Sequence, residues 1–210
     1  MAMGLNLYNE HSVFDEVGVP MDVQRYHNDE SWRLALHRQF NDKAERIVGR
    51  RLFPETPSDT QRRYPGTKQL NDVFEAKNIW HDQSWWMEQS ANTPDELAAL
   101  LDRVESRIKD LRSFILPANW DAEKKRLIAL GVKPPLYRGQ RGPVTFATSV
   151  FGVENLIFLI LDNPSLAARF RDAIIAAMLG IARVLDEEAG YTPDTAPHGF
   201  SFADDNCCML

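Results

Sequence analysis

The stretch "NPSLAARFRDAIIAAMLGIARVLDEEAG", residues 163–190, decides the architecture of the second half of the chain. Asparagine followed by proline is a typical helix start, because Asn163 can cap the first turn and Pro164 is tolerated at the first helical position. Gly190 is a typical helix end. Large apolar residues recur between them at helical spacing. The pattern predicts one long helix whose buried face is formed by Leu166, Phe170, Ile174, Met178, Ile181 and Leu185.

Short extended segments lie on both sides of this helix. Residues 135–140 fit one strand, and "GFSFAD", residues 199–204, fits another. A strand, a long crossover and a second strand usually form a right-handed unit whose two strands are parallel. A parallel strand needs a covering layer on each face, and no further element follows to supply it. We therefore expect the chain to be the N-terminal portion of a longer protein.

The first 131 residues predict helices and a hairpin instead of repeated strand–helix units. The clearest helix start is at Thr93. Thr93 and Glu96 fit a capping box, and Pro94 is at the first helical position, where proline is tolerated. The expected elements are a helix from about 29 to 49, a long loop over 50–70, a two-stranded hairpin within 72–89, a helix within 92–114 and a short helix over 120–130.

Composition excludes several classes of protein. The net charge is −6 and no basic patch stands out, so nucleic acid is not an expected partner. The longest apolar run, residues 155–161, is too short to span a bilayer, and the N-terminus lacks a signal peptide pattern. We expect a cytoplasmic protein without a membrane partner. Cys207 and Cys208 are adjacent, so we interpret them as buried thiols and predict no metal site.

The segment "RGPVTFATSVFGVENLIFLILDNPSLAARFRDAI", residues 141–174, resembles a signature region of the uroporphyrinogen decarboxylase superfamily. The resembling features are Gly142-Pro143 followed by Thr145, then Gly152, the entry "DNPSLAARF" into the long helix, and the strand "GFSFADDNCCML" at 199–210. The superfamily also contains cobalamin- and thiol-linked methyltransferases. The match covers about residues 132–210, and residues 1–131 fit only as a plausible N-terminal elaboration.

The resemblance implies an α/β fold, the N-terminal half of a (β/α)8 TIM barrel preceded by a helical and hairpin elaboration. Residues 1–131 would hold this elaboration and the first barrel units, and residues 132–210 a βαβ barrel segment that stops before closure, in one domain overall. Residues 144–150, "VTFATSV", favour a strand by propensity, but the family places a helix there, and we follow the family. In such barrels the active site lies at the carboxyl ends of the strands.

The implied function is that of a uroporphyrinogen decarboxylase, a carboxy-lyase that acts on a tetrapyrrole in porphyrin biosynthesis and needs no cofactor. A first alternative is methyl transfer between a corrinoid and a thiol with zinc, whose His and Cys ligands would lie beyond Leu210. A second alternative is a non-catalytic half-barrel that is stabilised by forming a homodimer. For both enzyme hypotheses the partner is a small molecule.

Six residues are candidates for the site. Asp204 and Asp205 follow the last strand and would stabilise a cationic intermediate, although aspartate is also a common loop cap. Asp205 stands where the decarboxylases carry a hydroxyl residue, and Ser149 stands where they carry a tyrosine. A doubled aspartate is more typical of the methyltransferase-like members. The expected substrate-binding residues are Arg138, Arg141, Ser149 and Asn206. The two arginines are included because the substrate carries carboxylates and a guanidinium can bind a carboxylate through two hydrogen bonds.

Overall fold

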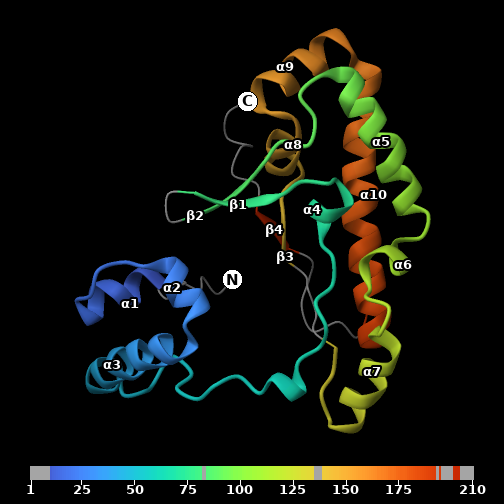
Figure 1. Ribbon diagram of the computed structural model, residues 1–210. Helices are drawn as coiled ribbons and strands as arrows, with labels where there is room; N and C mark the ends of the chain where they lie inside the picture. Colours follow the sequence, from blue (N-terminus) through green and yellow to red (C-terminus); the bar gives the residue numbers. More distant parts are fainter. Residues whose placement is uncertain (1–9, 82–83, 135–138, 193, 195–200, 204–210) are drawn as a thin grey trace. The chain divides into compact units, whose positions relative to one another are not determined.

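The computed structural model describes residues 10–81, 84–134, 139–192, 194 and 201–203 (Figure 1). The chain divides into two compact units, which are described separately. The first unit contains residues 1–61 and 80–85, and the second contains residues 62–79 and 86–210. The boundary predicted between residues 131 and 132 lies inside the second unit.

The first unit is built from three helices, α1 (Glu10–Val17), α2 (Val23–Asn28) and α3 (Glu30–Val48). The predicted limits of α3 are confirmed, because the Asp29 side chain accepts a hydrogen bond from the Trp32 amide and Gly49 ends the helix with a φ of 73°. The left-handed conformation at this position favours glycine. Seven buried apolar residues of this unit form one cluster: Val13, Phe14, Val23, Tyr26, Leu36, Phe40 and Ala44.

A buried asparagine holds the segment that follows α3. The Asn41 side chain is 0 % exposed. Its Oδ1 accepts hydrogen bonds from the Leu52 and Phe53 amides at 2.8 and 3.0 Å. Its Nδ2 donates to the Phe53 carbonyl at 2.8 Å and to Glu55 Oε1 at 2.6 Å. Residues 52–55 therefore have a fixed position on α3, although the sequence predicts only a loop there.

Replacing Asn41 with alanine is expected to release this segment at a cost of about 2 kcal/mol, because two backbone amides lose their acceptor. Hydrogen exchange of the Leu52 and Phe53 amides, followed by NMR, should become much faster. Asn28→Ala is the matched control, because Asn28 makes an exposed hydrogen bond to the Gln24 carbonyl. Unchanged protection of both amides in Asn41→Ala would show that the asparagine does not hold the segment.

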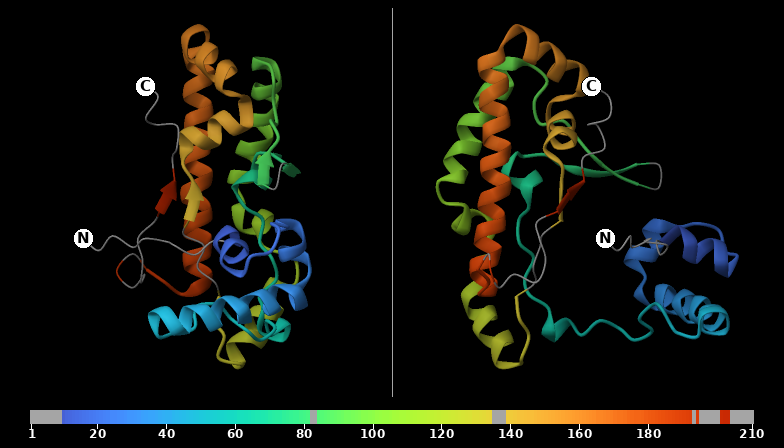
Figure 2. Two further views of the ribbon diagram at one scale, coloured as in Figure 1. Left: turned by 90° about the vertical axis from the view of Figure 1, so that its left-hand side faces the viewer. Right: turned by 180° about the vertical axis from the view of Figure 1, so that it is seen from behind.

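The second unit contains most of the helices of the described residues. Its longest helix, α10, packs against α5, α6, α8 and α9 (Figures 1 and 2). The short 3-10 helix at Thr60–Arg62 and the paired strands β1 (Asn78–His81) and β2 (Ser84–Met87) contain residues of both units. The elements that lie wholly in the second unit are, in chain order, α4 (Leu70–Val73), α5 (Pro94–Ile108), α6 (Leu111–Ile115), α7 (Trp120–Ala129), β3 (Gly139–Arg141), α8 (Pro143–Phe151), α9 (Val153–Asp162), α10 (Pro164–Ala189) and β4 (Ser201–Ala203).

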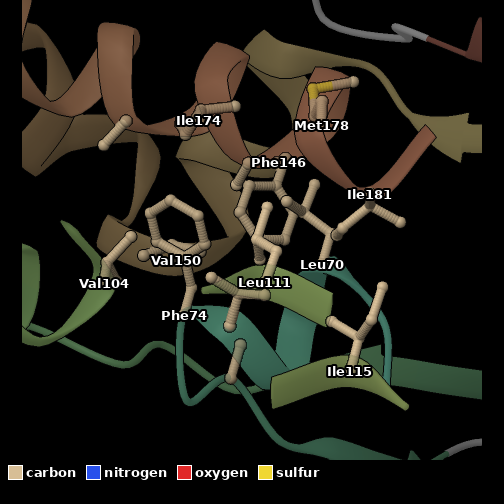
Figure 3. Close-up of a cluster of buried hydrophobic side chains, with 14 of the residues drawn as sticks. Leu70, Phe74, Val104, Leu111, Ile115, Phe146, Val150, Ile174, Met178 and Ile181 are labelled. Atoms are coloured by element: carbon tan, nitrogen blue, oxygen red, sulfur yellow. The ribbon is translucent and has the colours of Figure 1, made fainter. Parts of the chain in front are cut away.

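The core of the second unit lies between α10 and the helices that surround it (Figure 3). Phe74, which follows α4, is 0 % exposed. Its ring meets Phe146 of α8 edge to face at a centroid distance of 5.1 Å, and Phe170 of α10 lies 6.2 Å away. One aromatic side chain therefore connects three elements, and this packing fixes where α8 lies against α10.

The predicted ends and buried face of α10 are confirmed. The Asn163 side chain accepts a hydrogen bond from the Leu166 amide at 3.1 Å. Gly190 ends the helix with a φ of 72°. Five of the six predicted core residues are buried, and Leu166 is partly buried against the same cluster. The buried five are Phe170, Ile174, Met178, Ile181 and Leu185.

Residues 143–151 form α8, as the resemblance implies, and not the strand that propensity favours. α8 and α9 meet at Gly152, whose φ of 86° and ψ of 146° are accessible to glycine and strained for other residues. In the described part of the chain no single helix has the length and hydropathy to cross a membrane. α8 and α9 pass that test only as a pair, and they are bent by 99°.

The predicted TIM-barrel fold is wrong. A (β/α)8 barrel requires a strand before each helix. The described residues hold instead two separate two-stranded sheets, and residues 94–129 form three successive helices with no strand between them. The described part of the chain is mostly helical, and its core is formed by helices that pack on helices. Its strand–helix–strand unit contributes one pair of short parallel strands, β3 and β4.

Candidate functional site

The two parallel strands bring distant parts of the chain together. β3 pairs with β4 in parallel, with Gly139 opposite Ser201, Gln140 opposite Phe202 and Arg141 opposite Ala203. This confirms the predicted parallel pairing. Because the two strands are parallel, both end at the same edge of the pair. The crossover that joins them contains α8, α9 and α10 (Figure 2). Arg141 is the last residue of β3, so its side chain starts from this edge.

The structure brings together two of the predicted site residues. Arg141 Nη1 donates a hydrogen bond to Ser149 Oγ at 2.8 Å. Ser149 lies in α8, and its hydroxyl donates to the Thr145 carbonyl at 2.8 Å. Because the hydroxyl proton is used by this carbonyl, the Ser149 oxygen is oriented to accept from the arginine. The guanidinium is therefore held against α8 by a neutral side chain.

Arg141 has no ion pair with any described carboxylate, in contrast to Arg112 and Arg169, which each contact two. Its side chain is exposed, and one N–H group contacts Ser149. The other N–H groups of a guanidinium can bind a carboxylate through two hydrogen bonds. α8 starts two residues later at Pro143, and the positive end of its dipole favours an anion near the same edge.

The other four predicted site residues, Arg138, Asp204, Asp205 and Asn206, lie outside the described residues. In the sequence Asp204 directly follows Ala203, the residue paired with Arg141. The expectation that the two aspartates act beside the arginine therefore stays a prediction from the sequence.

Sequence reasoning missed Gln140. This residue is buried, with 6 % of its surface exposed, and its Nε2 donates to the Met178 carbonyl of α10 at 3.2 Å. Its Oε1 is buried and has no hydrogen-bond partner among the described residues. The contact with α10 fixes the end of β3 and so positions Arg141. No local signal in the sequence marks this residue, because the carbonyl that it contacts lies 38 residues away in the chain.

Sequence reasoning also missed a buried carboxylate at the far end of α10. Glu188 accepts hydrogen bonds at 2.8 Å from Arg112 Nε, Trp120 Nε1 and Lys124 Nζ. Burial raises the pKa of this carboxyl, but the hydrogen bonds from Lys124, Trp120 and Arg112 outweigh burial and lower it to about 2. The carboxylate is surrounded by donors from α6 and α7, so we interpret it as a structural group that joins these helices to α10.

Within the described ranges, no group of three or more His, Cys, Asp or Glu side chains is arranged to hold a metal ion. The zinc ligands expected for the methyltransferase alternative would in any case lie beyond Leu210. This finding therefore does not separate the two enzyme hypotheses.

Comparison with known proteins gives no match to a family model, to a curated protein or to a solved structure. The resemblance to the uroporphyrinogen decarboxylase superfamily therefore stays a prediction from the sequence features at 141–174 and 199–210.

Proposed function

We propose that this chain belongs to a uroporphyrinogen decarboxylase-like enzyme and that the edge formed by β3 and β4 binds a carboxylate group of a tetrapyrrole substrate. The observation that supports the proposal is the geometry of Arg141. The guanidinium is oriented by Ser149 at 2.8 Å and has no ion pair with a described carboxylate. A polycarboxylate needs such an arginine, because a fixed guanidinium binds carboxylate more strongly than a mobile one.

In the proposed reaction an acetate side chain of the substrate loses CO2 and gains a proton, which leaves a methyl group. Protonation of the neighbouring pyrrole gives a cationic ring, and this ring accepts the electron pair of the breaking C–C bond. The exocyclic methylene carbon that results then takes up a proton, and the ring releases the proton it had gained, so that one proton is consumed overall. Asp204 and Asp205, which follow β4 in the sequence, are the proposed carboxylates that stabilise this cation. No cofactor is needed for these steps.

Two sequence departures weaken the decarboxylase candidate, and one of them, the doubled aspartate at 204 and 205, favours a second candidate, the transfer of a methyl group between a corrinoid and a thiol. Ser149 stands where the decarboxylases carry a tyrosine, and Asp205 stands where they carry a hydroxyl residue. In the structure the Ser149 hydroxyl contacts Arg141, so serine at this position orients the arginine. The proposed carboxylate contact is therefore through Arg141 and not through residue 149.

The proposal is tested by incubating the chain with reduced uroporphyrinogen and separating the products by their number of carboxylates. We expect loss of carboxylates with the native chain. Arg141→Gln should lower kcat/KM by roughly tenfold to a hundredfold, because a charge-assisted hydrogen bond to the substrate is lost. Arg183→Gln, at an exposed position of α10, makes the same change of charge and should have no effect.

Two results would overturn the decarboxylase proposal. One is a native chain that leaves the number of carboxylates unchanged while remaining folded. The other is an Arg141→Gln variant as active as the native chain, which would move the carboxylate-binding site away from β3.

A further inference from the structure

The first unit contains a buried histidine whose two ring nitrogens are both engaged in hydrogen bonds. His37 lies in α3 and is 3 % exposed. Its Nδ1 is 2.7 Å from the Pro54 carbonyl oxygen, and its Nε2 is 2.5 Å from the Tyr26 hydroxyl of α2. The ring also stacks on Phe53 at a centroid distance of 4.8 Å. One side chain of α3 therefore contacts both α2 and the segment that follows α3.

These two hydrogen bonds suit the neutral ring. The Pro54 carbonyl oxygen can only accept, so Nδ1 must carry a proton. A neutral imidazole then has a lone pair on Nε2, and the Tyr26 hydroxyl donates to it. The charged form of His37 would carry a second N–H on Nε2, pointing at this hydroxyl. Uptake of a proton therefore breaks the hydrogen bond from α2 as it stands.

The nearest basic side chain opposes a positive charge on the ring. Arg33 lies one turn before His37 on α3 and donates to the Tyr26 carbonyl at 2.9 Å. Its guanidinium lies 6.0 Å from the Tyr26 ring. From α1 the residue against Tyr26 is Phe14, an uncharged ring at 5.6 Å. Neither Arg33 nor Phe14 stabilises a cation at His37.

The nearest carboxylate is already used by other donors. Glu55 follows Pro54, and its charge favours a proton on His37. Its Oε1 accepts hydrogen bonds from Arg51 Nε at 2.5 Å and from Asn41 Nδ2 at 2.6 Å. Burial and the charge of Arg33 therefore outweigh the effects of the Pro54 hydrogen bond and Glu55, and they lower the pKa of His37.

We propose that His37 makes the first unit sensitive to mild acid: the neutral ring holds α2 and residues 52–55 on α3, and uptake of a proton releases them. The released ring regains water, where a charged imidazole is stable. Release would also separate Phe53 from Phe40, whose rings meet edge to face at 5.0 Å. The inference does not depend on the proposed function, because it uses no residue of the β3–β4 edge.

The direction of the pH dependence follows from proton linkage. The pKa of His37 in the folded chain is lower than its ordinary value of 6.5. The released state therefore binds more protons, and the packing is fully stable above about pH 6.5 and weakens as pH falls below it. Hydrogen bonds from the Trp32 amide and from Arg51 lower the pKa values of Asp29 and Glu55 below 3.8 and 4.5. These carboxylates stay ionised where the histidine acts.

Hydrogen exchange of the Leu52 and Phe53 amides tests the proposal, with each rate divided into the intrinsic rate at the same pH to give a protection factor. In the native chain both factors should fall by up to about tenfold from about pH 7.5 to 5.5, the limit for uptake of one proton. His37→Gln keeps a donor and an acceptor but does not titrate, so its factors should stay constant. His27→Gln is the matched control, because His27 is an exposed histidine of α2, and it should behave like the native chain.

The proposal fails if protection in the native chain changes by less than about twofold over this range, or if His37→Gln loses protection as steeply as the native chain. Nitrogen-15 NMR of the histidine rings in the native chain gives a second test that needs no variant. We expect the proton on Nδ1 of His37 at neutral pH, and loss of Leu52 and Phe53 protection as the ring takes up its second proton. A neutral ring with its proton on Nε2, or a charged ring with both amides still protected, would contradict the proposal.

Discussion

Replacing Glu188 with glutamine is expected to lower the free energy of unfolding of the second unit by about 3 kcal/mol, the lower end of the cost of breaking a buried ion pair. The carboxylate side chain is 9 % exposed and pairs with Arg112 and Lys124, whose side chains are 47 % and 26 % exposed. Because both cations can regain water, the cost should not reach the upper end of that range. Trp120 keeps an acceptor, since glutamine retains one side-chain oxygen.

Urea unfolding followed by tryptophan fluorescence measures this effect. Glu187→Gln is the matched control, because Glu187 is the neighbouring residue and is exposed. It should change the free energy of unfolding by less than about 0.5 kcal/mol. Equal stabilities of the Glu188 and Glu187 variants would show that the buried carboxylate does not join α6 and α7 to α10.

The same carboxylate predicts the direction of the pH dependence. The pKa of Glu188 is lowered to about 2 in the folded chain, from an ordinary value of 4.5. A group with a lowered pKa contributes stability above its unfolded pKa, and this contribution is lost as pH falls through the folded value. The difference in stability between the native chain and Glu188→Gln should therefore be constant above about pH 5 and shrink between pH 4.5 and 2.

Glu75 should add to the acid sensitivity of the native chain. Hydrogen bonds from Arg103 and Arg107 outweigh the effect of burial and lower its pKa to about 2 as well. This contribution is present in both the native chain and Glu188→Gln. Acid should therefore still destabilise the variant, but less steeply.

Phe74→Ala is the second large effect, with an expected loss of about 3 to 5 kcal/mol, because a fully buried phenylalanine leaves a cavity that its neighbours fill only in part. Urea unfolding again gives the value. Phe74→Leu should lose less, since most of the volume is kept. Ile128→Ala removes an exposed apolar side chain and should be close to neutral.

The Phe74 variant also tests how the core positions the site. Phe74 packs on Phe146 of α8, and α8 carries Ser149, which orients Arg141. A loss of stability of less than about 1 kcal/mol in Phe74→Ala would contradict the packing between α4, α8 and α10.

Local chemistry explains why some elements could be predicted. The ends of α3 and α10 follow from side chains within a few residues of each end, such as Asp29 and Asn163. The parallel pairing of β3 with β4 followed from the crossover rule, which needs only the order of the elements. Helical spacing likewise located the buried face of α10.

The rest could not be predicted because it depends on contacts between distant residues. Gln140 meets a carbonyl 38 residues away, and the partners of Glu188 lie 64 to 76 residues away. Nothing in the local pattern marks either residue. The barrel was inferred from a family likeness confined to the second half, whereas residues 94–129 form helices that pack directly on α10 or its neighbours.

The pairing of Arg141 with Ser149 shows what the sequence could contribute to the site. Both were expected to bind substrate, but as separate residues. Their contact exists because residues 143–151 are helical, which places Ser149 beside the end of β3. A strand in this segment, as propensity favours, would not give that arrangement.

The central claim is that Arg141, at the edge of β3 and β4, binds a carboxylate of a tetrapyrrole, and direct binding tests it best. Uroporphyrin, the stable oxidised form of the proposed substrate, can be titrated with the chain and followed by its fluorescence. We expect saturable binding by the native chain and by Arg183→Gln, and a dissociation constant raised about tenfold or more in Arg141→Gln. Equal binding by the native chain and Arg141→Gln would contradict the account.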